Sequence, residues 1–245
     1  MMEINKIYNE DCLQTMRKMP NGFIDLTVTS PPYDGLRTYN GYSFDFESIA
    51  KELYRTTKEG GVVVWVVGDS TKKGSESLTS FKQALYFKEI GFNVHDTMIY
   101  KSEKPPLTHN RYEQKFEYMF VFSKGKPNTF NPILEPSKYA GQDKKSRTLR
   151  QDSDQLGNRS GKGKVKDFKI KGNVWEYSTG GGKSTKDKCA FKHPAIFPEK
   201  LANDHIISWS NEDDVVYDCF GGSGTTAKMS KILNRKWIVS EVSKD

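Results

Sequence analysis

Residues 215–226 read VVYDCFGGSGTT, a β-branched run followed by a glycine-rich turn and two threonines. The next residues, Ala227–Leu233, have the spacing of a helix, and Lys236–Ser240 reads as a further strand with Glu241 at its end. Glycine permits a positive φ and a close approach of the main chain to a ligand. A strand, a glycine turn and a helix N-terminus place backbone N–H groups where they bind polar or anionic ligand groups. An acidic residue about 20 positions further on is a usual partner of a ribose hydroxyl. This segment therefore predicts a parallel α/β sheet with a nucleotide site.

A second motif lies near the start of the chain. An apolar run, residues 23–28, leads directly into Thr29-Ser30-Pro31-Pro32-Tyr33. Each proline lacks a backbone donor and holds φ at about −65°, and the residue before a proline is held extended. A buried strand with this ending presents rigid carbonyls beside an aromatic ring, which suits a site for an exocyclic amino group on a planar base. Taken alone, the stretch is also compatible with a proline-rich loop that closes a strand.

Together the two motifs resemble the S-adenosylmethionine-dependent DNA amino-methyltransferases. The order is the permuted one, in which Ser30–Tyr33 precedes the cofactor motif formed by Phe220, Gly222 and Gly224. Other stretches are similar to segments of that family as well, namely 9–13 (adenine side of the cofactor), 192–201 (methionine side) and 173–176. The resemblance covers nearly the whole chain apart from roughly residues 136–172. It implies a doubly wound, mostly parallel Rossmann-like α/β sheet with an inserted target-recognition region.

The resemblance also implies the site residues. The catalytic ones are Ser30, Pro31, Pro32 and Tyr33, where Ser30 and the Pro31 carbonyl accept the amino hydrogens and Tyr33 stacks on a flipped-out base. The cofactor-binding ones are Asp11, Cys12, His193, Asp218, Phe220, Gly222, Gly224, Thr225 and Glu241. The DNA-binding ones are Arg37, Lys144, Lys145, Arg147, Arg150 and Arg159. Simpler alternatives stay open for two of these residues: Asp11 as the N-cap of a Leu13–Lys18 helix and His193 as a hydrogen-bonded loop residue.

The first residue of the catalytic motif bears on the target base. In the family, serine at this position goes mainly with cytosine N4, and aspartate or asparagine with adenine N6, so Ser30 favours cytosine N4 in double-stranded DNA. Adenine N6 stays open as the alternative, as does a DNA-binding subunit with an inactive methyltransferase fold. A ring-carbon methyltransferase needs a cysteine after a proline, which this chain lacks. Cys12 and Cys219 are expected to be small, half-buried neighbours of the pocket, and Cys219 stands where the family usually has proline.

Composition agrees with a nucleic-acid partner. The 245 residues carry 38 Lys and Arg against 31 Asp and Glu, a net charge of +7, which favours a polyanion. Three scattered cysteines indicate neither a disulfide framework nor a metal site, and a reducing cytoplasm is the expected location. We expect no signal peptide, because the N-terminus lacks an apolar core. We expect no membrane association either, because the longest apolar run, Val62–Val67, is too short to span a bilayer.

Strands and helices are expected to alternate along the chain. The pattern predicts strands at Ile24–Thr29, Val62–Val67, Asn93–Tyr100 and Glu117–Phe122, and helices at Phe46–Tyr54, with a glycine C-cap at Glu59–Gly61, and Ser80–Ile90. The expected division is a catalytic part at 1–135, a basic target-recognition insertion at 136–172 and a cofactor-binding part at 173–245. The insertion is rich in lysine and glycine, so a flexible solvated loop is the alternative to a DNA-reading region. The chain stops soon after Glu241, so weaker cofactor binding or completion of the site by another chain is expected; by resemblance, a homodimer or a restriction-system partner is also compatible.

Overall fold

A computed structural model describes residues 2–32, 44–101, 111–145, 147–150, 156–159, 161–178, 184–185, 187 and 196–243, with the main chain alone at 147–150 and 156–159. The chain divides into two compact units. The larger unit combines Met1–Asn131 with Asn173–Asp245, and the smaller one is Pro132–Gly172. The smaller unit thus begins at Pro132, where the sequence suggested a boundary at residue 136.

The larger unit is built on one eight-stranded sheet with the order β1-β14-β13-β2-β3-β7-β6-β12. Neighbouring strands run parallel except at β7, which is antiparallel to both β3 and β6. The strands are β1 (Lys6–Tyr8), β2 (Ile24–Thr29), β3 (Thr57–Val67), β6 (Asn93–Lys101), β7 (Phe116–Ser123), β12 (Val174–Glu176), β13 (Val215–Asp218) and β14 (Lys236–Ser240). A doubly wound, mostly parallel Rossmann-like sheet is therefore confirmed.

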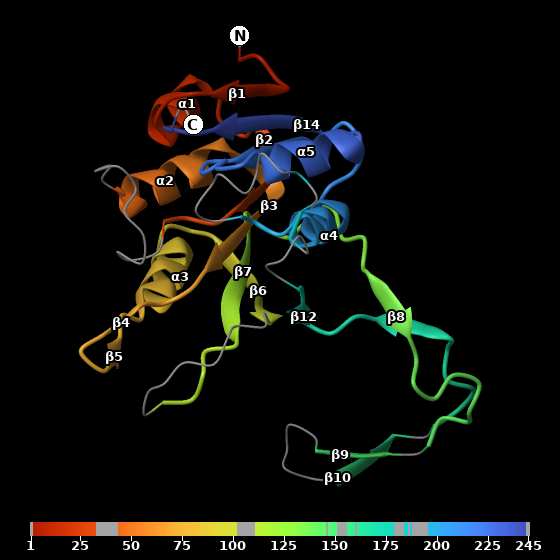
Figure 1. The fold of residues 1–245 in the computed structure, drawn as a ribbon. Helices are drawn as coiled ribbons and strands as arrows, with labels where there is room; N and C mark the ends of the chain where they lie inside the picture. Colours follow the sequence, from red (N-terminus) through yellow and green to blue (C-terminus); the bar gives the residue numbers. More distant parts are fainter. Residues whose placement is uncertain are drawn as a thin grey trace. The chain divides into compact units, whose positions relative to one another are not determined.

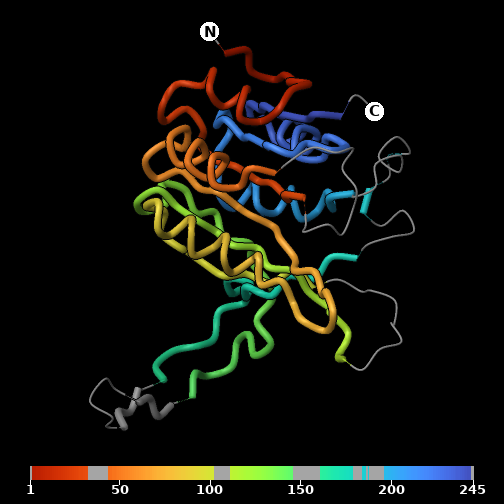
Figure 2. The backbone as a smooth tube through the Cα atoms, turned by 90° about the vertical axis from the view of Figure 1, so that its left-hand side faces the viewer, coloured from red at the N-terminus to blue at the C-terminus, as the bar shows by residue number. Residues whose placement is uncertain are grey.

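Helices cover both faces of this sheet (Figure 1). One face carries α1 (Cys12–Lys18), α2 (Phe46–Thr56) and α3 (Thr79–Glu89), and the other carries α4 (Glu199–Trp209) and α5 (Thr225–Ile232). Figure 2 shows α2 and α3 in front of the sheet, side by side. Because helices lie on both sides, the centre of the sheet is covered on both faces, and every side chain of the apolar run Val62–Val67 in β3 is buried.

Most elements lie where the sequence pattern predicts them. The bounds of β2 and β14 are as predicted, those of α3 and β7 differ by one residue at each end, and β6 is one residue longer at its end. A two-residue ladder, β4 (Thr71–Lys72) with β5 (Ser75–Glu76), follows β3 and was not predicted. No helix in the described part of the chain is long and apolar enough to cross a membrane.

The predicted glycine C-cap of α2 is wrong. The helix ends at Thr56, and Thr57 already has an extended conformation as the first residue of β3. Gly60 lies inside β3 with a φ of +77°, where the register with β2 shifts from Ile24↔Thr57 to Leu26↔Val62. The glycine pair therefore accommodates a bulge in a strand, which a helix-stop signal resembles in sequence.

The smaller unit consists of two antiparallel ribbons. In one, β8 (Leu134–Pro136) pairs with β11 (Phe168–Ile170), and in the other β9 (Arg147–Arg150) pairs with β10 (Leu156–Arg159). The sequence pattern predicted no strand here, because each strand has only three or four residues and β8 meets a partner more than 30 positions away. No side chain described in this unit is buried, in keeping with its basic composition.

Candidate active site

The candidate site lies at the edge of the large sheet where its parallel strands end. Ser30 follows β2, Phe220 closely follows β13, and Glu241 follows β14. The register places Tyr217 beside Thr27 in the neighbouring strand, so both motifs reach the same edge. In open α/β sheets, ligands bind in the crevice outside the carboxyl ends of the strands. The fold thus brings together two motifs that are almost 190 positions apart in sequence.

A buried carboxylate joins the two motifs. Asp218 Oδ1 accepts a hydrogen bond from the Thr29 hydroxyl at 2.6 Å and another from the backbone N–H of Phe220 at 3.0 Å. Burial raises the pKa of Asp218, and hydrogen bonds from Thr29 and Thr226 act in the opposite direction. Asp218 therefore has internal partners, and its assignment as a cofactor ligand stays a prediction.

The glycine turn after β13 is held by a second carboxylate. Glu241 Oε2 accepts the backbone N–H of Gly222 at 2.6 Å, and Oε1 accepts that of Ser243 at 2.8 Å. Gly222 and Gly224 have φ values of +48° and +78°, which favour glycine. A Cβ placed on Gly221 would come within 2.0 Å of Val239 Cγ1, so this turn position also requires glycine.

Three observations show that this turn fits a nucleotide-like cofactor. A Cβ on Gly224 would meet no described atom within 4 Å, so the turn has an open side. Gly224 is the N-cap of α5, and no side chain described here caps the helix, which leaves N–H groups for a ligand. The Glu241 carboxylate lies next to the turn and keeps capacity to accept hydroxyl donors.

Phe220 extends the turn into an aromatic cluster. Its ring meets Phe44 edge-on at 5.6 Å between centroids, and Trp65 at 6.1 Å. The ring is half-buried. Phe44 is the first described residue after Pro32, so Phe220 connects the cofactor turn to the chain that follows Ser30–Tyr33.

The N-terminal segment also reaches this edge. Asp11 Oδ1 accepts the backbone N–H of Leu13 at 2.8 Å and caps α1, so the simpler alternative for this residue is observed. Cys12 and Cys219 are both buried, so the expectation that they are half-buried is wrong; burial raises the pKa of Cys12 to about 12. Asn9 was part of the recognised stretch but not of the expected site, and its Nδ2 donates to the carbonyls of Glu241 and Ser243.

An ion cluster connects α5 to the first residue of α4 and to the chain before it. Lys228 Nζ lies 2.6 Å from Asp187 Oδ2 and 2.7 Å from Glu199 Oε1. Thr185 donates to the same Glu199 oxygen. Hydrogen bonds to Asp187 and Glu199 raise the pKa of Lys228. The segment expected at the methionine end of the pocket thus contacts the helix that carries the glycine turn.

The structure describes only part of the expected site. Ser30 and Pro32 are half-buried and Pro31 is buried, whereas Tyr33, Arg37 and His193 lie outside the described residues. Thr225 is the buried first residue of α5. In the smaller unit Lys144 and Lys145 are exposed, and the strand register sets Arg147 opposite Arg159 and Arg150 opposite Leu156. Sequence reasoning missed Thr29 as the partner of Asp218, although its place directly before Ser30 was the available signal.

Comparisons with known proteins agree with this geometry. The family model described as DNA methylase matches residues 24–245. The orphan methyltransferase M.BamHII of Bacillus amyloliquefaciens is 58% identical over 226 residues, which cover 91% of this chain and 85% of that protein. The solved structure of PvuII DNA methyltransferase (cytosine-N4-specific) has a TM-score of 0.69 at 23% identity and covers 97% of this chain and 82% of its own.

A structure solved with the cofactor shares the fold. A DNA modification methylase of Thermus thermophilus, complexed with S-adenosylmethionine, has a TM-score of 0.62 at 18% identity over 98% of this chain and 88% of its own. The match of the DNA methylase family covers most of the chain, including both motifs. The chain therefore belongs to the S-adenosylmethionine-dependent DNA amino-methyltransferases, whose members methylate the exocyclic amino group of cytosine or adenine.

Proposed function

We propose that this protein methylates the N4 of a flipped-out cytosine in double-stranded DNA at a specific site. The observation that carries this proposal is Ser30, which stands first in the catalytic motif, directly after β2. Its hydroxyl is a weaker acceptor than the carboxylate or amide that goes with adenine N6. The PvuII enzyme, whose name states cytosine-N4 specificity, shares the fold.

The residues of the motif act on the amino group. The Ser30 hydroxyl and the Pro31 carbonyl accept its two hydrogens, which draws the nitrogen lone pair out of conjugation with the ring and orients it. Pro31 and Pro32 hold these acceptors rigid, because proline fixes φ and the preceding residue is held extended. Stacking of Tyr33 on the base stays a prediction. A base within a duplex cannot enter such a site, so the nucleotide has to leave the stack.

The glycine turn and its neighbours would hold the cofactor. Gly222, Gly224 and the first N–H groups of α5 suit the polar groups of S-adenosylmethionine, and Glu241 suits its ribose hydroxyls. When bound, this cofactor supplies a methyl group on a sulfonium centre. The Thr29–Asp218 hydrogen bond holds the ends of β2 and β13 together and so fixes the position of Ser30 relative to the glycine turn. A direct methyl transfer needs such positioning of the two reactants.

The partner is double-stranded DNA, and the smaller unit is proposed as the part that binds its phosphates. Lys144, Lys145, Arg147, Arg150 and Arg159 belong to that unit. Several relatives are named type II methyltransferases, while M.BamHII is named an orphan. A role in a restriction-modification system is therefore part of this proposal, with or without a restriction partner.

Methyl transfer from labelled S-adenosylmethionine to unmethylated duplex DNA tests the proposal, with the digested nucleosides separated by mass spectrometry. We expect label in N4-methylcytosine and a loss of at least about 100-fold in kcat for Ser30→Ala, with cofactor affinity unchanged. Label in N6-methyladenine would keep the mechanism and overturn the base assignment. Intact DNA binding without label in any nucleoside would favour a non-catalytic subunit.

A further inference from the structure

Nearly all the net charge of the chain lies on the smaller unit. Pro132–Gly172 contains eleven Lys and Arg against five Asp and Glu, hence +6 of the total +7. The remaining 204 residues therefore carry only +1. The smaller unit has 41 residues, this positive charge and no described buried side chain, so it attracts polyanions. DNA is therefore a better partner for it than an ordinary protein surface.

The β8–β11 ribbon presents different chemistry on its two faces. Leu134 pairs with Ile170, and Phe168 pairs with Pro136 on the same face. Leu134, Phe168 and Ile170 are each more than half exposed. On the other face Glu135 and Lys169 form an ion pair of 2.8 Å. A two-stranded ribbon of this width fits the major groove of B-DNA, where apolar side chains contact thymine methyl groups.

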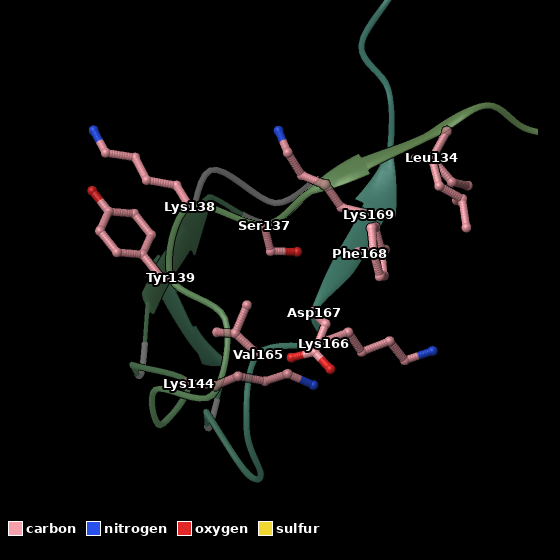
Figure 3. A pocket seen from close by; sticks show the side chains of 11 residues that line it. Leu134, Ser137, Lys138, Tyr139, Lys144, Val165, Lys166, Asp167, Phe168 and Lys169 are labelled. Atoms are coloured by element: carbon pink, nitrogen blue, oxygen red, sulfur yellow. The ribbon is translucent and has the colours of Figure 1, made fainter.

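A cavity of about 920 Å³ borders this ribbon, and its lining combines lysines with aromatic rings. Figure 3 shows Lys138, Lys144 and Lys166 around it, with Tyr139 and Phe168 on opposite sides. Lys138 lies over the Tyr139 ring at 5.6 Å. Ser137 and Asp167 add the polar groups, and the Ser137 N–H donates to the Asp167 carbonyl at 2.7 Å.

Asp167 is the acidic residue of this lining. Among the described residues its carboxylate has neither a hydrogen-bond donor nor an ion-pair partner, although Lys144 and Lys166 line the same cavity. A carboxylate only accepts hydrogen bonds, and close to phosphates it weakens binding by repulsion. Its presence on a DNA-facing surface makes physical sense where a base offers an amino donor. In the major groove the usual donor to Asp is the N4 amino group of cytosine.

We infer that Asp167 is a specificity-determining residue, which accepts a hydrogen bond from the amino group of a cytosine within the recognition sequence. This cytosine is read in the major groove and need not be the methylated base. The inference rests on the proposed function only in taking double-stranded DNA as the partner. In this arrangement Phe168 and Tyr139, which belong to the same lining, would contact the bases, and the lysines would contact phosphates.

A binding selection tests this inference without requiring methyl transfer. The full-length protein with S-adenosylmethionine is incubated with a random duplex library, and the bound DNA is sequenced. Asp167→Ala is compared with Asp143→Asn, an acidic position of the same unit that lies outside the cavity lining and loses the same charge. Asp167→Leu, which has a similar size and no hydrogen-bond acceptor, serves as the second variant in case the alanine variant does not fold, as judged by circular dichroism.

The expected result is a loss of preference at one base pair in the Asp167 variants. A contact of this kind discriminates by about 5- to 150-fold against other bases, and this discrimination should fall to near unity. Preferences elsewhere in the site and the dependence of binding on salt should stay as in the unaltered protein, because Asp167 contacts no phosphate. Asp143→Asn should retain the full recognition sequence.

Two results would overturn the inference. One is an unchanged preference at every position in a folded Asp167 variant. The other is a failure of the unaltered protein to select any DNA sequence. Binding of a second copy or of another protein through this surface, instead of DNA, belongs to the same outcome. The failure of the proposed function can be told apart from the failure of this inference. A protein that selects a sequence through Asp167 but transfers no methyl group would contradict only the catalytic assignment.

Discussion

The Thr29 hydroxyl donates a 2.6 Å hydrogen bond to Asp218 Oδ1, across 189 positions of the chain. Thr29 ends β2 directly before the catalytic motif, and Asp218 ends β13 shortly before the glycine turn. Both residues are buried. The bond therefore connects the strand that leads into Ser30, the proposed acceptor for the target amino group, with the strand that leads into the glycine turn.

Replacement of Thr29 by valine should destabilise the fold by about 1–3 kcal/mol, because a buried carboxylate loses a donor while the side-chain volume stays similar. Urea unfolding followed by circular dichroism measures the change. Thr29→Ser keeps the hydroxyl and should lose much less. Equal unfolding midpoints for the valine variant and the unaltered protein would show that the bond contributes nothing.

Gly221→Ala should destabilise the protein by about 1–3 kcal/mol, because the new Cβ overlaps Val239 Cγ1, 2.0 Å away. Gly172→Ala is the control, since a Cβ there meets no described atom within 4 Å and the φ of Gly172 is not in the left-handed region. Thermal unfolding of the two variants gives the comparison. In a Val239→Ala background, Gly221→Ala should cost less than in the unaltered protein, and an equal cost would point to a different source of strain.

Glu241→Ala should weaken S-adenosylmethionine binding by about 10- to 100-fold, because the Gly222 N–H loses a charged acceptor and the turn loosens. Glu241→Gln retains an acceptor oxygen and should lie between the alanine variant and the unaltered protein. Isothermal titration calorimetry measures the affinity, and Glu89→Ala on the exposed end of α3 serves as a surface control. Undiminished affinity in the alanine variant contradicts a role for this carboxylate.

His205 should make the protein less stable at mildly acidic pH. Burial lowers the pKa of His205 from 6.5 to about 3, and the Asp204 carboxylate acts in the opposite direction but less than burial does. The unfolded chain thus binds a proton that the folded protein excludes, and stability is lost as pH falls through 6.5. The expected loss is about 2 kcal/mol between pH 7 and pH 5.

The His205→Gln variant, unfolded with urea at several pH values, isolates this effect. Its stability should depend less on pH across this window, whereas His95→Gln, at an exposed position, should behave like the unaltered protein. Asp218 has a raised pKa, so its contribution to the pH dependence of the free energy of unfolding has the opposite sign. This contribution is the same in all three proteins and does not affect the comparison. Parallel pH profiles for His205→Gln and the unaltered protein would contradict the prediction.

Local signals gave accurate element bounds where one segment contains the whole signal. The run Ile24–Thr29 is apolar and stops at prolines, and β2 has these same bounds. The pair Gly60 and Gly61 carried an ambiguous signal, because a positive φ serves a helix cap and a strand bulge equally well. The register between β2 and β3 decides between them, and a local pattern does not contain it.

The sequence by itself determined the fold class and the family and indicated the candidate site, because short motifs in a particular order specify a strand end, a glycine turn and a helix start. Only the tertiary structure showed that Asp218 bonds Thr29, that Glu241 holds the Gly222 turn, and that Asp167 shares a cavity lining with lysines. These relations join residues brought together by strand pairing and burial. Distance in space, and with it the partner of each polar group, depends on the packing of the whole chain.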